Sequence, residues 1–311
     1  MRPTTPFVFL LLPTLGLAQD PTSPAVNQAP PARAIRGASG LDTGSMYFFR
    51  GMLQEDQGII AQPWVELGTT LIDGPEHTGP DTLDLTFGLW NSLHDGPTGS
   101  SGPRTGGPGA AGSLWYESDF YVDLAARFGE RLDLATRYTA YTSPNGFFDP
   151  ARRRGFRTTV EEVALTASYD DRELLLDAVA NGLQPHVTIA FELSGQRDNG
   201  TQRGIYGEVG VAPSFALGEI GSSPVTLTVP LTFGMSLTDY YEDQAGGRDE
   251  FFGYLSVGAV LTMPLGCMPE RFGCWTCELG LTALMLGDNL EERNDGDTSE
   301  VVLTFGVATK F

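Results

Sequence analysis

The end of the chain, residues 300–311, alternates between large apolar side chains and mostly small or polar ones, and it closes on an aromatic residue. Successive side chains of a β-strand point to opposite faces, so this pattern gives one apolar and one polar face. Such a strand suits a wall between lipid and a polar interior. The apolar face includes Val301, Leu303, Phe305, Val307 and Phe311.

Similar alternation recurs in twelve segments separated by turn residues. Most reach the ~9 to 11 residues that a tilted membrane strand needs. An even strand count brings both ends of a bacterial barrel to the periplasm, so the pattern predicts an all-β fold, a single antiparallel transmembrane β-barrel of about 12 strands with periplasmic N and C termini. The segments lie near residues 45–52, 59–72, 82–93, 114–127, 131–142, 157–168, 185–195, 203–216, 225–238, 251–264, 272–286 and 299–311.

The connections predict loops of two kinds, since outer-membrane barrels have long outer loops and short periplasmic turns. Gly129 and Glu130 form a tight inner turn, whereas residues 94–113 form a long outer loop rich in glycine and proline. The inner connection 169–184 is longer. Asp170 followed by Glu173 resembles a capping box, which predicts a short periplasmic helix there.

The N-terminal part of the chain predicts export. Arg2 precedes an apolar run at 7–12, and small residues end at Ala18, so residues 1–18 are expected to be a signal peptide. The proline-rich residues 19–41 are expected to be a flexible periplasmic leader, and residues 42–311 the barrel. Because no other stretch has eighteen successive apolar residues, an ordinary helical membrane protein is excluded. The expected location is the bacterial outer membrane.

The polar faces of the strands carry charged residues that we expect to line the lumen. An ionised side chain facing lipid at mid-depth costs ~2 to 4 kcal/mol, so these residues must point inward if the chain forms a barrel. Carboxylates dominate this set, which predicts a lumen that attracts cations. The lumen and selectivity candidates are Glu66, Asp84, Glu117, Asp119, Asp123, Asp133, Glu162, Glu192, Glu208, Glu278, Arg127 and Arg137.

Composition argues against two other classes of function. The net charge of −20 makes nucleic acid an improbable partner. The chain has three histidines, His77, His94 and His186, and none has a serine-hydrolase motif around it. We therefore expect no enzyme activity, no catalytic residue and no cofactor.

The three cysteines, Cys267, Cys274 and Cys277, flank one inner turn. A zinc site would need a fourth ligand, which is missing from this spacing, so no metal is expected. An exported protein can form disulfides. We expect a Cys267–Cys274 disulfide, with Cys267–Cys277 and three free thiols as alternatives.

Two polar clusters lie in the outer connections. Arg152, Arg153, Arg154 and Arg157 could hold the phosphates of lipopolysaccharide or an anionic solute, although a solvated loop is the simpler interpretation. The cluster Asn294, Asp295, Asp297 and Glu300 lacks the spacing of a calcium loop and is expected to be a solvated tip.

Two motifs resemble known barrel families. Phe311 resembles the C-terminal signal that the barrel-assembly machinery reads in bacterial outer-membrane proteins. The motif Tyr-Phe-Phe-Arg-Gly at 47–51, followed by Gln62 and Pro63, resembles the first hairpin of the TorF-type porin family, and the tyrosines at 121 and 138–141 extend the resemblance. The cysteine hairpin and loop 94–113 depart from that pattern. The resemblance implies a small outer-membrane barrel with a transport role, in which Arg50 is a structural or lumen arginine.

The sequence therefore predicts a porin-like channel for a small hydrophilic solute, cation-selective through its acidic lumen. Its expected partners are outer-membrane lipid, lipopolysaccharide and the barrel-assembly machinery. A non-conducting structural or surface-recognition barrel is the main alternative, because side chains can fill a barrel of this size. A soluble periplasmic β-sandwich binding protein is the other alternative, but sandwich strands are usually only ~5 or 6 residues long.

Overall fold

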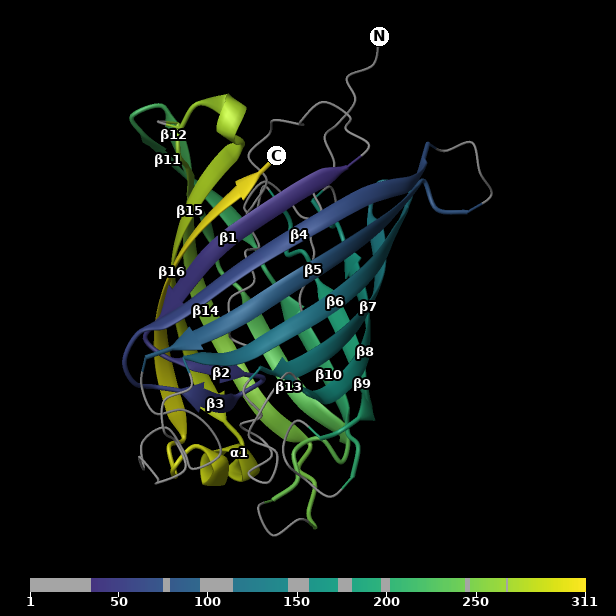
Figure 1. Ribbon diagram of the computed structural model, residues 1–311, viewed down its shortest axis with the longest axis vertical. Coiled ribbons are helices and arrows are strands. Elements are labelled where there is room, and N and C mark those ends of the chain that lie inside the picture. The colour runs from purple at the N-terminus through teal and green to yellow at the C-terminus, as the bar shows by residue number, and fades with distance from the viewer. Residues whose placement is uncertain are drawn as a thin grey trace.

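The alternating segments pair edge to edge until β16 meets β1 and closes the wall of a barrel (Figure 1). The computed structural model describes residues 35–74, 79–95, 114–144, 157–172, 181–196, 202–243, 247–266 and 268–311. If a strand broken at proline is counted once, the wall has twelve antiparallel strands, which confirms the predicted fold class. The wall comprises β1 (Arg36–Gly44), β4 (Ile60–Asp73), β5 (Thr82–His94), β6 (Trp115–Phe128), β7 (Leu132–Ser143), β8 (Arg157–Tyr169), β9 (His186–Ser194), β10 (Ile205–Val211) with β11 (Ser214–Ile220), β12 (Ser223–Thr228) with β13 (Leu231–Thr238), β14 (Phe252–Pro264), β15 (Cys274–Leu286) and β16 (Ser299–Lys310).

The strand β1 begins and β16 ends at the same end of the barrel, the upper end in Figure 1. We call this the proximal end and the opposite one the distal end. The tight turn predicted at Gly129 and Glu130 is confirmed between β6 and β7 at the proximal end. The prediction that this end faces the periplasm stays a prediction.

The first wall strand is β1, whereas the sequence predicted residues 45–52 for this position. Residues 36–41, expected in the flexible leader, therefore belong to the wall. β1 contains many small residues, so it shows no apolar alternation in the sequence. Packing against the neighbouring strand nevertheless requires small residues there. A Cβ atom at Gly40 would lie 2.6 Å from the ring of Trp64 on the neighbouring strand. Residues 1–34 lie outside the described residues.

Two predicted strands, 203–216 and 225–238, are each broken in two. Pro213 stands between β10 and β11, and Pro230 stands between β12 and β13. Proline has no N–H to donate to a strand ladder, so regular pairing stops beside it. On the proximal side of the two prolines, β11 pairs with β12 among the described strands, and this hairpin extends the barrel at its proximal end (Figure 1).

The wall separates an apolar exterior from a polar interior. Leu67, Phe87 and Leu303 are 51%, 55% and 52% exposed on the outer surface, as expected of side chains that face lipid. The carboxylates predicted to face the lumen are all buried or half-buried. Both observations agree with the predicted facing, and the role of these carboxylates in a lumen stays a prediction.

Helices are scarce in the described parts of the chain. The helix α1 (Asp288–Arg293) lies at the distal end, and the 3-10 turn η1 (Glu270–Phe272) lies in the connection between β14 and β15. Neither of these described helices is long and apolar enough to cross a membrane. The helix predicted within 169–184 falls mainly on residues outside the described ranges.

Candidate functional site: the lumen and its plug

A short hairpin follows β1 and folds into the barrel, where the sequence had predicted a wall strand. β2 (Tyr47–Phe49) pairs with β3 (Met52–Glu55) inside the distal half (Figure 1). The chain reverses at Arg50 and Gly51, whose φ angles are 48° and 79°. Glycine is needed at 51 because a Cβ atom there would lie 2.6 Å from Leu290. We call residues 47–55 the plug.

Arg50 at the tip of the plug is completely buried, with an exposed fraction of 0%. Its two terminal nitrogens donate to the two oxygens of Glu162 on β8, at 2.7 and 2.8 Å. The hydroxyl of Tyr240 lies 2.7 Å from Nη1, and the guanidinium carbon lies 4.0 Å from the ring centre of Tyr206. This arrangement joins a bidentate ion pair to an aromatic face.

Electrostatics hold Arg50 in its charged form. Burial alone would lower the pKa of its guanidinium, but the neighbouring Glu162 carboxylate raises that pKa well above the ordinary value. A second buried carboxylate, Glu208, lies close by and accepts a hydrogen bond from Tyr206 at 2.6 Å. The region around Arg50 is therefore built for a cation.

The backbone of the plug tip is also fixed by residues from the distal connections. The Tyr241 hydroxyl donates to the Arg50 carbonyl at 3.0 Å. The amide of Asn294 donates to the Gly51 carbonyl and accepts from the Leu53 N–H, both at 2.8 Å. Asn294, expected to belong to a solvated tip, is instead a buried contact of the plug.

The base of the plug meets the wall through a second buried cluster. Glu55 Oε2 lies 3.5 Å from Nδ1 of His94, and His94 Nε2 lies 2.7 Å from the hydroxyl oxygen of Ser92. Burial raises the pKa of Glu55 to about 7, although the N–H groups of Gln57 and Asp56 oppose this shift by donating to its other oxygen. The side chains of Glu55, Ser92 and His94 all lie in the barrel interior, with exposed fractions of 0% or 1%.

The order serine, histidine and carboxylate matches a hydrolase triad, which our sequence analysis had not found. A working triad needs a nucleophile that substrate can reach. Ser92 is 0% exposed, and Glu55 belongs to the plug itself, so withdrawing the plug to admit substrate would remove the third member. The cluster acts as a contact between plug and wall.

Ion pairs line the lumen towards the proximal end. Arg137 on β7 makes two hydrogen bonds to Asp123 on β6, at 2.7 and 2.8 Å. Arg127 pairs with Asp133 across the β6–β7 hairpin at 2.6 and 2.8 Å. Asp84 on β5 accepts from Arg36, which our sequence analysis placed in the leader.

The ten predicted lumen carboxylates all lie in the interior. Seven are buried and three, Glu66, Asp133 and Glu278, are half-buried. Neutral donors bind several of these carboxylates: Tyr121 donates to Glu66 at 2.6 Å, and Gly204 N–H donates to Glu192 at 2.7 Å. Glu117 accepts from Tyr47 of the plug at 2.8 Å, and Glu278 accepts from Thr262 at 3.3 Å. Asp119 and Glu208 are buried, and Glu208 accepts from Tyr206.

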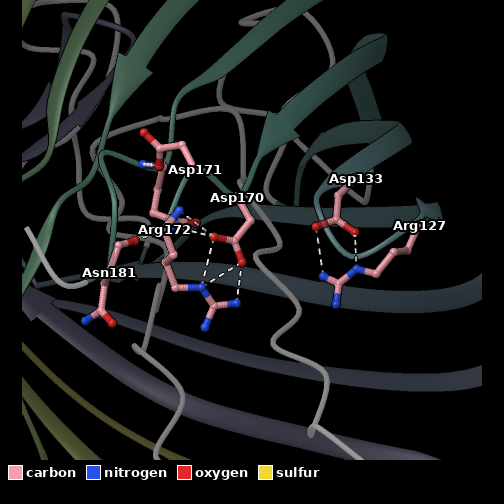
Figure 2. A network of polar contacts seen from close by, with 7 residues as sticks. Arg127, Asp133, Asp170, Asp171, Arg172 and Asn181 are labelled. Carbon is pink, nitrogen blue, oxygen red and sulfur yellow. Dashed lines mark hydrogen bonds and ion pairs between the residues drawn. The ribbon is translucent and has the colours of Figure 1, made fainter. Parts of the chain in front are cut away.

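The proximal rim carries a further polar group, seen in Figure 2 beside the Arg127–Asp133 pair. The Arg172 backbone N–H donates to Asp170 Oδ1 at 3.1 Å, and its side chain folds back onto the same carboxylate. The hydrogen bonds to Arg172 lower the pKa of Asp170, although burial by itself would raise it. Asp170 thus begins a local turn, and the helix that the capping-box motif predicted after it stays a prediction.

Several predicted sites are only partly described. Cys274 and Cys277 are free thiols and Cys267 lies outside the described residues, so the expected disulfide is not confirmed. Most of loop 94–113 and Arg152 to Arg154 also lie outside, as does the side chain of Arg157. In the parts of the chain that the structure describes, no group of three or more His, Cys, Asp or Glu side chains is placed to hold a metal.

The plug was not predicted because residues 47–55 have the sequence pattern of a membrane strand. The run from Tyr47 to Phe49 resembles an aromatic girdle, but here those side chains are buried inside the barrel. The available signal was Arg50 followed by Gly51, since a charge between aromatics does not suit a lipid-facing strand and glycine permits a tight reversal. The tyrosines that surround Arg50 come from a distant strand and a distant connection, which no local pattern reveals.

A closed antiparallel barrel with an apolar exterior and a polar, filled interior is the architecture of bacterial outer-membrane β-barrels. Solved structures with a similar architecture include an outer-membrane channel of the COG4313 group from Pseudomonas putida F1, with 13% identity, a TM-score of 0.48, and coverage of 91% of this chain and 97% of that chain. The NanC porin shows 12% identity and a TM-score of 0.38, with 89% and 100% coverage. LpxR from Salmonella typhimurium shows 8% identity and a TM-score of 0.42, with 88% and 99% coverage.

At these identities and TM-scores the likenesses assign this chain no solute, partner or reaction. No family model matches the sequence. No curated protein matches it either. The resemblance to the TorF-type porin family stays a prediction.

Proposed function

We propose that this protein is an outer-membrane, porin-like channel for a small hydrophilic solute, with a preference for cations and a distal end closed by the plug. The observation that carries the proposal is the charge of the interior. The ten predicted carboxylates are buried or half-buried there, and the whole chain has 39 acidic against 19 basic residues, a net charge of −20.

An excess of fixed carboxylates in a narrow polar passage raises the local concentration of cations and repels anions. Asp84, Asp123 and Glu278 would act from the proximal half, where the arginine partners of the first two are partly exposed and Glu278 is half-buried. Arg137 stacks on Tyr121, with its guanidinium carbon 4.4 Å from the ring centre, and would hold the neighbouring acids in position. Passage further requires the plug to move or loosen.

A non-conducting structural or surface-recognition barrel is the second candidate. It is favoured by the completeness of the plug contacts, because Tyr47, Arg50, Gly51 and Leu53 are all bonded to the wall or to the distal connections. In that case the interior charges serve only to fix the plug and the strands. Conduction separates the two candidates.

The test is single-channel recording of the folded, purified protein in a planar bilayer under a KCl gradient. Discrete steps with a reversal potential for cations are expected, and Arg50→Ala should open more often because the plug loses its main anchor. Anion selectivity would overturn the role given to the carboxylates. If neither the wild type nor Arg50→Ala conducts, although both shift in heat-dependent gel mobility as folded barrels do, the non-conducting barrel is correct.

The remaining partners follow from the same proposal. The exposed apolar belt would contact outer-membrane lipid, and the arginine-rich connection would meet lipopolysaccharide. Phe311 is 46% exposed at the proximal end, and its backbone pairs with Gly37 of β1. We propose it as the residue that the barrel-assembly machinery reads before β1 pairs with β16.

A further inference from the structure

The buried surroundings of Arg50 can be divided into parts contributed by the plug and parts contributed by the rest of the barrel. Glu162 lies on β8, Tyr206 on β10 and Tyr240 in the connection after β13. We call these three residues the cage. None of them belongs to the plug, so the backbone segments that carry the cage are separate from the segment that carries Arg50.

The chemistry of the cage selects a guanidinium group among cations. A carboxylate that accepts two parallel hydrogen bonds, at 2.7 and 2.8 Å, matches the planar fork of a guanidinium. The Tyr206 ring, 4.0 Å from the guanidinium carbon, offers a flat face for stacking. An ammonium group is a compact point charge and cannot satisfy both partners in this way.

An empty cage would be unfavourable. Glu162 is 2% exposed and Glu208, next to Tyr206, is 1% exposed. Buried carboxylates without a compensating cation are strongly destabilising. While Glu162 is ionised, the cage therefore favours a cation, whether it comes from the chain or from solution.

Arg50 fills the cage imperfectly. Its Nε atom is buried without a hydrogen-bond partner, and its backbone has a φ of 48°, which non-glycine residues adopt rarely. Both penalties arise because the guanidinium is attached to a tight turn. A free guanidinium compound would make the same contacts without that backbone constraint.

We propose that the cage of Glu162, Tyr206 and Tyr240 is a binding site for guanidinium-type cations, which Arg50 occupies as a tethered ligand. A soluble guanidinium compound that enters the barrel competes with Arg50 and favours release of the plug tip. Release of the plug tip rests on the proposed channel function. It identifies guanidinium compounds as the class of solute that opens the channel. The first step, binding, does not depend on conduction.

The test removes the tethered ligand and supplies a free one. Arg50→Ala, folded in detergent, is expected to unfold at a lower temperature than the wild type, and propylguanidinium chloride should restore its stability. Propylammonium chloride at equal ionic strength is the matched probe. The apparent affinity for propylguanidinium should be about tenfold higher, which corresponds to about 1.4 kcal/mol, because only the guanidinium group makes two parallel charge-assisted hydrogen bonds to Glu162.

Two carboxylate variants control for nonspecific effects of the salt. Adding Glu162→Gln to Arg50→Ala should abolish the preference for propylguanidinium. Glu161→Gln should leave it intact, because Glu161 is the next residue on β8 and bonds to Tyr138 and Ser194 away from the cage. Equal stabilisation by both probes, or a preference that survives Glu162→Gln, would overturn the proposal.

A second variant guards against failure to fold. If Arg50→Ala does not fold alone, the yield of folded protein during refolding with each probe becomes the measurement, and Arg50→Gln is refolded in parallel. Failure of propylguanidinium to raise the yield of either variant would also overturn the proposal that the cage binds guanidinium-type cations. If propylguanidinium restores folding in detergent but the protein does not conduct in the bilayer, the binding site is supported and the channel function is overturned.

Discussion

The distal and proximal halves of this barrel share the same wall strands but have different interiors. The distal half is filled by the plug and by buried aromatic residues such as Tyr116, Tyr206 and Tyr254, all 1% exposed or less. The proximal half contains arginine–carboxylate pairs whose arginine side chains are partly exposed, and in the pair Arg127–Asp133 both side chains are, at 19% and 28%. An alternating strand therefore specifies a polar inner face without specifying whether that face meets water or a packed core.

The largest effect is expected from breaking the ion pair in the distal half. Glu162→Gln leaves Arg50 charged and buried with a neutral partner, and loss of one member of a buried pair costs about 3 to 5 kcal/mol. The heat-modification temperature of the folded band should fall markedly. Glu161→Gln, one residue away on the same strand, should change it far less.

If Glu162→Gln and Glu161→Gln destabilise the barrel equally, the plug contributes little to stability. The distal half would then resemble the proximal half energetically, and the contrast between them would be one of composition only.

An intermediate effect is expected from pH, through Glu55 at the base of the plug. Its pKa is raised to about 7 in the folded protein from an ordinary value of 4.5. The folded state therefore binds the proton more tightly, and this contribution, on the order of 1 to 3 kcal/mol, is complete below pH ~4.5 and is lost as pH rises through ~7. Ionised Glu55 would add a third carboxylate beside Asp56 and Asp95, facing His94.

The measurement compares the unfolding midpoints of the wild type and Glu55→Gln from acidic to mildly alkaline pH. The difference between the two proteins should change with pH in favour of Glu55→Gln at alkaline pH. A difference independent of pH would mean that Glu55 has an ordinary pKa and that the base of the plug is hydrated.

The smallest effect is expected in the proximal half. Arg127→Ala removes an ion pair that water reaches, and such pairs contribute about 0.2 to 1 kcal/mol. High salt should reduce even this contribution, whereas it should barely affect the buried Arg50–Glu162 pair. Chemical denaturation at low and high salt measures both quantities. A loss from Arg127→Ala as large as that from Glu162→Gln would remove the proposed distinction between the halves.

The sequence predicted most of the wall correctly because alternation is a local property. Segments such as 114–127 and 299–311 coincide closely with β6 and β16, and seven of the ten carboxylates predicted for the lumen are buried. β1 was missed because its role is set by its neighbours: Gly40 is small to admit Trp64, and that demand leaves no apolar pattern. The strand breaks at Pro213 and Pro230 could have been predicted from the sequence, since proline interrupts the hydrogen-bond ladder between strands.

The candidate site was less predictable. Arg50 was recognised as a candidate lumen arginine, but its partners Glu162, Tyr206 and Tyr240 are far away in sequence. Ser92 and His94 stand two residues apart on β5 and so share a face, yet Glu55 joins them only because the plug folds inward.

The sequence by itself determined that this chain forms a barrel wall, which residues face lipid and which charges face inward, because a strand fixes the facing of each side chain locally. The tertiary structure alone decided that residues 47–55 leave the wall and fill the lumen. That decision depends on a buried guanidinium finding a carboxylate and two tyrosines on distant elements, an energy that exists only once the barrel has closed around it.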